Sequence, residues 1–240
     1  MVKAGRRSKP KANLLRHDTP KEATELAQGN EWNISRFGKH IERCLGEYAL
    51  VFHEIVSLHA HIDVHMVPPS KKRPFYTLVT SGMSDKPMNV PKGAEKFSYA
   101  ELMLCLPPDW PMEEKNWKNR RNYWPIEFLK ILARMPHEYD TWLFHGHTIP
   151  NGETARCFPG TKFCCAFINR PVHVPVKFEK LKISKKKTIN FYGVYFLYRE
   201  EMDVKMTRGY DALAECLIRA DASEFVDVNR KNGAKMRVAK

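Results

Sequence analysis

Four side chains that can bind metal ions or transfer protons alternate along one short segment of the chain. His59, His61, Asp63 and His65 are separated by single apolar residues. In an extended strand, every second side chain points to the same face, at steps of about 6.6–7 Å. Imidazole and carboxylate groups are ligands of zinc and non-haem iron, so a metal-dependent hydrolase is one hypothesis. Because ligands two residues apart on a straight strand seldom converge on one ion, the alternative is a hydrogen-bonded polar face of an open sheet.

More histidines follow later in the chain. His137 and Asp140 precede His145 and His147, which lie in a glycine-containing loop. A metal centre would have to join this loop to the strand histidines, with His61, His65 and His147 as the candidate ligands. The chain has no helical His-Glu-x-x-His motif. The sequence therefore predicts no resident metal ion or other cofactor, and the hydrolase stays an alternative.

The segment Ser81-Gly82-Met83-Ser84-Asp85 offers hydroxyl groups directly after a predicted strand. It lacks the Gly-x-Ser-x-Gly turn that exposes a serine nucleophile. Ser84 and Asp85 can instead bond nearby backbone amides, and Gly82 can adopt a positive φ. We therefore expect a loop held in one shape rather than a catalytic serine.

Composition predicts an ordinary globular protein. Of the 240 residues, 43% are hydrophobic and 11% aromatic, and no apolar run reaches the roughly 18 residues of a membrane helix. The N-terminal basic residues are not followed by an apolar stretch, so they do not form a secretory signal. The six cysteines show no Cys-x-x-Cys spacing, which predicts reduced, packed thiols. These features together predict a cytoplasmic protein with no membrane partner.

The net charge of +13 is unevenly distributed. Residues 1–30 carry seven basic and three acidic residues, and residues 229–240 carry five basic and no acidic residues. Residues 31–228 carry 28 basic and 24 acidic residues. We therefore expect basic, disordered tails at 1–30 and 229–240 around one folded domain at 31–228, with only weak, non-specific nucleic-acid contact by the tails.

Hydrophobic periodicity divides the domain into strands and a few helices. Helices are predicted at 34–48, from about Pro125 to Pro136, and at 199–220 with a break at Gly209. Strands are predicted at 59–67, 75–80, 97–106, 162–168, 172–183 and 188–197, with residues 82–94 as a long loop and Lys185–Lys187 as a hairpin turn. This order predicts an α+β fold in which a mixed or mainly antiparallel sheet packs with a few helices.

An ordered set of motifs resembles the suppressor of fused-like domain family. The motifs are the loop from Thr80 to Met88, Trp124-Pro125, the segment from Pro136 to Trp142, and the segment from Gly146 to Gly152. The resemblance runs from about His53 to Asp211, and it is closer to the bacterial, single-domain members. The eukaryotic suppressor of fused is a cytoplasmic regulator that binds a zinc-finger transcription factor, and some bacterial relatives are thought to be immunity partners of toxins. Since its second lobe has no counterpart here, that transcription-factor partner does not transfer.

The resemblance implies a non-catalytic regulatory or inhibitory module that binds another protein, and it supplies no catalytic residues. Binding would use a sheet edge or a groove between the loops 82–94 and 140–152. The candidate binding residues are His61, Asp63, Ser81, Gly82, Met83, Ser84, Asp85, Glu101, Trp124, His137, Tyr139, Asp140, Trp142, His147 and Asn151.

Overall fold

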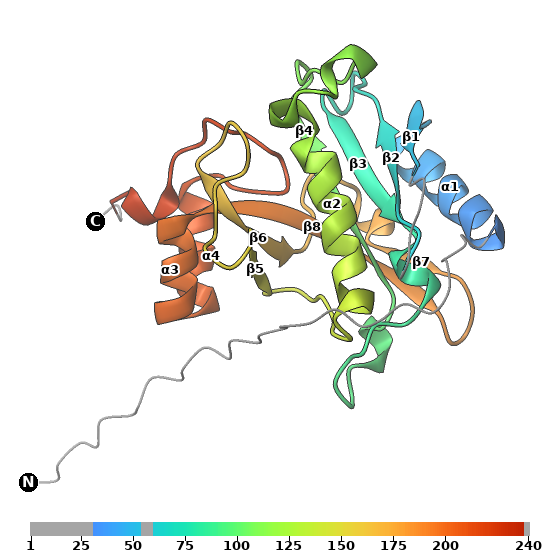
Figure 1. Cartoon of the computed structure of the whole chain (residues 1–240). Coiled ribbons are helices and arrows are strands. Elements are labelled where there is room, and N and C mark those ends of the chain that lie inside the picture. The colour runs from blue at the N-terminus through green and yellow to red at the C-terminus, as the bar shows by residue number, and fades with distance from the viewer. Residues whose placement is uncertain (1–30, 54–59, 238–240) are drawn as a thin grey trace, which may run out of the picture.

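A mixed sheet of eight strands forms the centre of the molecule in the computed structural model, which describes residues 31–53 and 60–237 (Figure 1). The strands are β1 Leu50–Phe52, β2 Asp63–Val67, β3 Tyr76–Ser81, β4 Ala100–Leu106, β5 Thr148–Pro150, β6 Phe163–Asn169, β7 Lys180–Lys182 and β8 Thr188–Tyr198. Their order is β1-β2-β3-β4-β8-β6-β5, and β7 pairs with β8. Only β4 and β8 run parallel, which confirms the predicted α+β class.

Helices cover both faces of this sheet. They are α1 Glu31–Leu45, α2 Arg120–Glu138, α3 Arg199–Arg208 and α4 Tyr210–Arg219. In Figure 1, α2 crosses one face, α1 lies beside β1 and β2, and α3 and α4 lie at the opposite end near β6. The side chains of β3 show the alternation directly, since Leu78 belongs to the core beneath α2 and Val79 to the core beneath α1. A third core packs α4 against β6 and β8.

Because both faces are covered, one prediction about β2 is wrong. All five residues of β2 are buried, whereas the sequence predicts one open polar face. Phe37, Ile41 and Leu45 of α1 form the apolar stripe that covers that face. The strand also begins at Asp63 rather than His59; residue 59 lies outside the described residues.

The helix predicted from Pro125 begins five residues earlier. Asn119 caps α2 by accepting a hydrogen bond from the backbone N–H of Arg121 at 3.0 Å. Both Pro125 and Pro136 lie inside the helix, which ends at Glu138. The predicted break at Gly209 is confirmed, because Gly209 separates α3 from α4.

Most of the strand predicted at 172–183 does not form. The backbone N–H groups of Val172 and His173 donate to the buried carboxylate of Glu224, at 2.9 and 2.7 Å, instead of to a neighbouring strand. Pro171 and Pro175 have no N–H to donate. Only Lys180–Lys182 remains as strand, and it forms the predicted hairpin with β8 around Lys185–Lys187.

The short strands β1 and β5 were not predicted, since three residues are too few to show a periodicity. All six cysteines are free thiols, and four of them are buried. No helix among the described residues has both the length and the apolar character needed to cross a membrane.

The expectation of a solvated tail from 229 onward does not hold for the described residues 229–237. Arg230 is buried and its guanidinium donates to both carboxylate oxygens of Glu201, at 2.7 and 2.6 Å. Gly233 also donates its N–H to Glu201, at 2.8 Å. This segment therefore belongs to the folded body. The predicted tail at 1–30 lies outside the described residues.

Candidate functional site

The loop after β3 is held by one buried carboxylate, that of Glu101 on β4. Glu101 is fully buried, and it accepts hydrogen bonds from the Thr80 hydroxyl at 2.6 Å and from the Ser84 hydroxyl and N–H at 2.7 and 2.9 Å. Burial raises the pKa of Glu101 to about 7, although these three hydrogen bonds favour the charged form; the nearby Asp85 raises it further. Glu101 is the only ionisable side chain apart from Cys105 in the otherwise apolar strand β4. It thereby fixes the start of the short 3-10 helix Met83–Asp85.

Gly82 allows this loop to approach the segment before β2. Its φ is 103°, and a β-carbon at this position would lie 1.8 Å from the backbone oxygen of His61. A glycine is therefore required here, as the sequence predicts from the turn. Met83, next in the chain, is fully buried, and its carbonyl accepts a hydrogen bond from Nε2 of His137 at 2.7 Å.

The strand histidines make separate contacts rather than one metal site. Asp63 lies between His53 and His61, with oxygen–nitrogen distances of 3.1 and 3.2 Å. His65 is only 3% exposed, and its Nε2 lies 2.9 Å from the Ser81 hydroxyl. Burial lowers the pKa of His65 to about 4; Asp63 opposes this shift and His53 adds to it.

The later histidines lie at the far side of the sheet. Tyr210 lies 3.2 Å from Nε2 of His145, and the ring of His147 packs edge-on against Trp142. Burial lowers the pKa of His147, opposed by its hydrogen bond with the backbone of Trp142. In the strand order β5 lies five positions from β2, a separation of roughly 24 Å along the sheet. No three His, Cys, Asp or Glu side chains among the described residues are arranged to hold a metal ion.

Two loops that are distant in the sequence contact each other, and we call them the loop pair: residues 82–94 and residues 140–152. The backbone N–H of Asn89 donates to the carbonyl of Thr141, and its side chain donates to the carbonyl of Asp140, both at 3.2 Å. The N–H of Leu143 lies 3.4 Å from the sulfur of Met88. The two loops therefore form one continuous surface, with Met88 buried beneath it; Asn89 is an exposed member that the sequence analysis did not identify.

Aromatic side chains gather on the second loop. Trp142 stacks on Phe144, with ring centroids 5.3 Å apart, and Phe144 contacts Phe97 at 4.4 Å. Trp142, Phe144, Phe97 and His147 are all partly exposed. Asp140 is exposed and adopts a positive φ of 52°, which places it at a tight turn directly after α2. Tyr139, the C-cap of α2, is partly buried.

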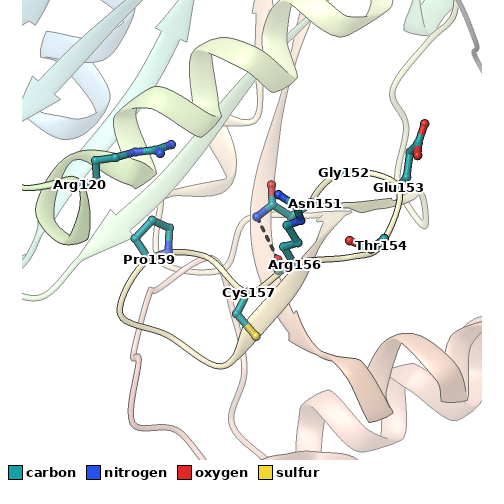
Figure 2. A pocket seen from close by; sticks show the side chains of 8 residues that line it. All are labelled: Arg120, Asn151, Gly152, Glu153, Thr154, Arg156, Cys157 and Pro159. Carbon is teal, nitrogen blue, oxygen red and sulfur yellow. Dashed lines mark hydrogen bonds between the residues drawn. The ribbon is translucent and has the colours of Figure 1, made fainter.

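Two further predicted binding residues have different environments, Trp124 in the core and Asn151 at the end of the loop 140–152. Trp124 is 2% exposed and packs between Phe158 and Phe196, so it is a core residue. Asn151 lines a cavity of about 540 Å³ between the start of α2 and the loop after β5. Figure 2 shows Arg120 facing this loop, with the Asn151 side chain bonded to the Arg156 carbonyl, 3.0 Å away. That hydrogen bond closes the turn of the loop.

The chain is thus an α+β domain with two contacting loops. No metal-binding cluster is present among the residues that the structure describes. The sequence matches the family described as Suppressor of fused protein (SUFU) over residues 59–231. The chain therefore belongs to the SUFU family.

Two solved structures support the fold, and a third has a lower similarity. A protein from Neisseria gonorrhoeae FA 1090 described as a SUFU (suppressor of fused protein) homolog is similar with a TM-score of 0.58 and 16% identity, over 85% of this chain and 96% of that one. The Sufu-Fu complex is similar with a TM-score of 0.50 and 14% identity, over 80% and 85%. Drosophila Suppressor of Fused has a TM-score of 0.47 and 14% identity, over 77% and 46%. No curated protein sequence matches the chain.

Proposed function

We propose that this chain is a non-catalytic protein-binding module that regulates or inhibits its partner, and that the partner contacts the loop pair. The contact between Asn89 and the carbonyls of Asp140 and Thr141 carries the proposal, because it joins two loops into one surface. Membership of the SUFU family and similarity to a protein solved as the Sufu-Fu complex support it.

The chemistry of the loop pair suits a protein partner. Partly exposed Trp142, Phe144 and Phe97 offer large aromatic area next to the exposed carboxylate of Asp140. Aromatic side chains are enriched in the centres of protein interfaces and account for much of their binding energy. The loop is also fixed in advance by Glu101 and Gly82, so little conformational freedom is lost on binding.

The edge strand β5 offers a second contact within the same surface. β5 is the last strand in the sheet order and lies inside the loop 140–152. An extended partner segment that pairs with its outer side would lengthen the sheet. Backbone groups of Ile149 face Ala166 of β6, and Pro150 has no N–H, so such pairing would depend on the N–H of Thr148 and the carbonyls of Thr148 and Pro150.

We further propose that the chain inhibits the partner that it binds, in the way that an immunity protein inhibits its toxin. The six free thiols suit a reducing compartment such as the cytoplasm. The proposal requires neither turnover nor a metal ion.

The test is affinity capture of partners from native cell extract, with the full chain as bait at moderate salt and identification by mass spectrometry. Asp140→Asn removes the charge but keeps a residue that tolerates a positive φ. Asp221→Asn is the matched control, because Asp221 is also exposed and has a φ of 49°. Trp142→Ala removes the central aromatic side chain.

We expect one stoichiometric protein that is captured by the wild type and by Asp221→Asn, and lost or weakened at least tenfold in Trp142→Ala and Asp140→Asn. Inhibition is then tested by adding the chain to the captured partner in an assay of that partner's own activity. Equal capture by all four baits would refute the loop pair as the binding surface. Absence of any specific partner would refute the binding function.

A further inference from the structure

Within residues 31–228, the excess of positive charge lies in one segment, which we call the lysine hairpin: residues 177–187. It contains six lysines and one glutamate. The rest of residues 31–228 contains 22 basic and 23 acidic residues. The whole excess of basic over acidic residues in 31–228 therefore lies in these eleven consecutive residues. The charge of the remaining residues is balanced.

These lysines are presented to solvent by the hairpin of β7 and β8. Lys180 and Lys182 point to one face of β7, and Leu181, between them, packs into the core beneath α1. Five lysines are exposed, namely Lys177, Lys180, Lys182, Lys185 and Lys186. The single carboxylate of the hairpin, Glu179, is already paired with Arg170 at 2.8 Å. Among the described side chains, none of these five lysines has a carboxylate within ion-pair distance.

The lysine hairpin is continuous with the loop pair. The side-chain amide of Asn190 on β8 donates to the carbonyls of Lys96 and Tyr99, at 3.2 and 3.1 Å, directly after the loop 82–94. Lys187 lies over the ring of Tyr99, 4.8 Å from its centroid. Burial lowers the pKa of Lys187, and the nearby carboxyl groups of Asp85 and Glu101 oppose this shift. A partner seated on the loop pair would therefore reach the hairpin.

We propose that the lysine hairpin binds an acidic, extended segment of the protein partner, an inference that rests on the proposed binding function. Side chains of one face of an extended segment recur every 6.6–7 Å, which matches the step from Lys180 to Lys182. The partner segment therefore carries Asp or Glu at alternate positions where it crosses β7.

The composition of the hairpin favours a protein over a nucleic acid. Nucleic-acid-binding proteins favour arginine, whose guanidinium bonds phosphate groups bidentately, and exposed aromatic rings on which bases stack. Residues 177–187 contain no arginine, and their one aromatic residue, Phe178, is fully buried. Lysine ammonium groups act as point charges and suit carboxylates that arrive from several directions.

The experiment compares two four-lysine variants of the full chain. The first replaces Lys180, Lys182, Lys185 and Lys186 by Gln, and the control replaces the exposed Lys71, Lys72, Lys118 and Lys162 by Gln. Both lose the same charge, and thermal melting verifies that both are folded. Binding of a fluorescent oligoglutamate peptide and of a single-stranded oligonucleotide of equal charge is measured by anisotropy at several salt concentrations. Each variant also serves as bait in the capture experiment.

We expect the hairpin variant to bind oligoglutamate roughly tenfold more weakly or worse, with a shallower salt dependence, and the control to stay within about twofold of the wild type. The hairpin variant should also lose the captured partner. Equal weakening in both variants, or a hairpin contribution that is larger for the oligonucleotide, would overturn the inference. Capture that is unaffected by the hairpin variant would overturn it while leaving the binding function intact. Capture of nothing by the wild type would instead refute the binding function, and the inference would fail with it.

Discussion

Single residues decide the shape of the loop after β3. Gly82 permits a backbone approach that no other residue could make, and Glu101 accepts three hydrogen bonds from the loop and its neighbour Thr80. His65 is a second buried titratable group, two strands away on β2. The candidate residues nearest the sheet therefore hold the loop after β3, and the exposed residues of the loop pair remain available for the proposed partner.

The first residue-scale prediction concerns Gly82→Ala. The added β-carbon would meet the His61 carbonyl oxygen at 1.8 Å in addition to the strain of a φ of 103°. We expect a loss of about 3 kcal/mol in the free energy of unfolding, measured by urea denaturation. Gly93→Ala is the control, since Gly93 has a φ of 91° with no atom within 4 Å of the added carbon, and should cost about 1 kcal/mol. Equal costs would contradict the close approach at Gly82.

The second prediction concerns Glu101 and pH. Because burial raises its pKa to about 7, the folded state binds more protons than the unfolded state between about pH 4.5 and 7. This group therefore stabilises the fold fully below pH 4.5 and loses about 3 kcal/mol as pH rises to 7. In Glu101→Gln this contribution is absent, so the variant should gain stability relative to the wild type as pH rises. A difference that is constant with pH would refute the shift.

His65 should act in the opposite direction over nearly the same range. Burial lowers its pKa to about 4, so its contribution is full above about pH 6.5 and is lost as pH falls through 4. The free energy of unfolding of the wild type should therefore change little with pH, because two opposite changes of about 3 kcal/mol largely cancel. His65→Gln should leave the Glu101 slope exposed, and Glu101→Gln the His65 slope. Denaturant unfolding of both single variants and of the double variant from pH 4 to 7.5 measures this; parallel profiles would contradict it.

At the scale of elements, the sequence correctly predicted the strands, hairpins and breaks that follow from apolar periodicity and turn residues. The hairpin of β2 and β3, the strands β4, β6 and β8, and the break at Gly209 lie where apolar spacing and glycine indicate them. The errors have tertiary causes. The alternating pattern of β2 indicates a solvated face, but α1 covers it, and the N–H groups of Val172 and His173 are satisfied by Glu224, far away in the sequence.

The candidate site was also predictable only in part, because its loops have local sequence signals but their contact is a tertiary feature. Glycine, proline and tryptophan identified the two loops, but their contact through Asn89 depends on the path of the whole chain. The charge of the lysine hairpin is visible in the sequence, whereas its continuity with the loop pair depends on the pairing of β7, β8 and β4.

At the scale of the whole molecule, the segment around Arg230 packs against the sheet and α3. The guanidinium of Arg230 donates to Glu201 at the start of α3 and to the carbonyl of Phe196 on β8, 2.6 Å away. It also lies over the rings of Phe163 and Tyr198, within 5.0 Å of both centroids. One side chain thus connects the last described segment to the sheet and to α3.

The last prediction is that residues 229–237 are needed for stability. Arg230→Ala leaves the fully buried Glu201 without its cation, so we expect a loss of about 3–5 kcal/mol in the free energy of unfolding. Glu201→Ala should cost a similar amount, and the double variant should cost less than the two together, because no charge is then left unpaired. Lys231→Ala is the control, since its side chain is exposed and only its backbone accepts from Arg230. If Arg230→Ala and Lys231→Ala unfold at the same urea concentration, the segment is a dispensable tail after all, and the folded body ends before residue 229.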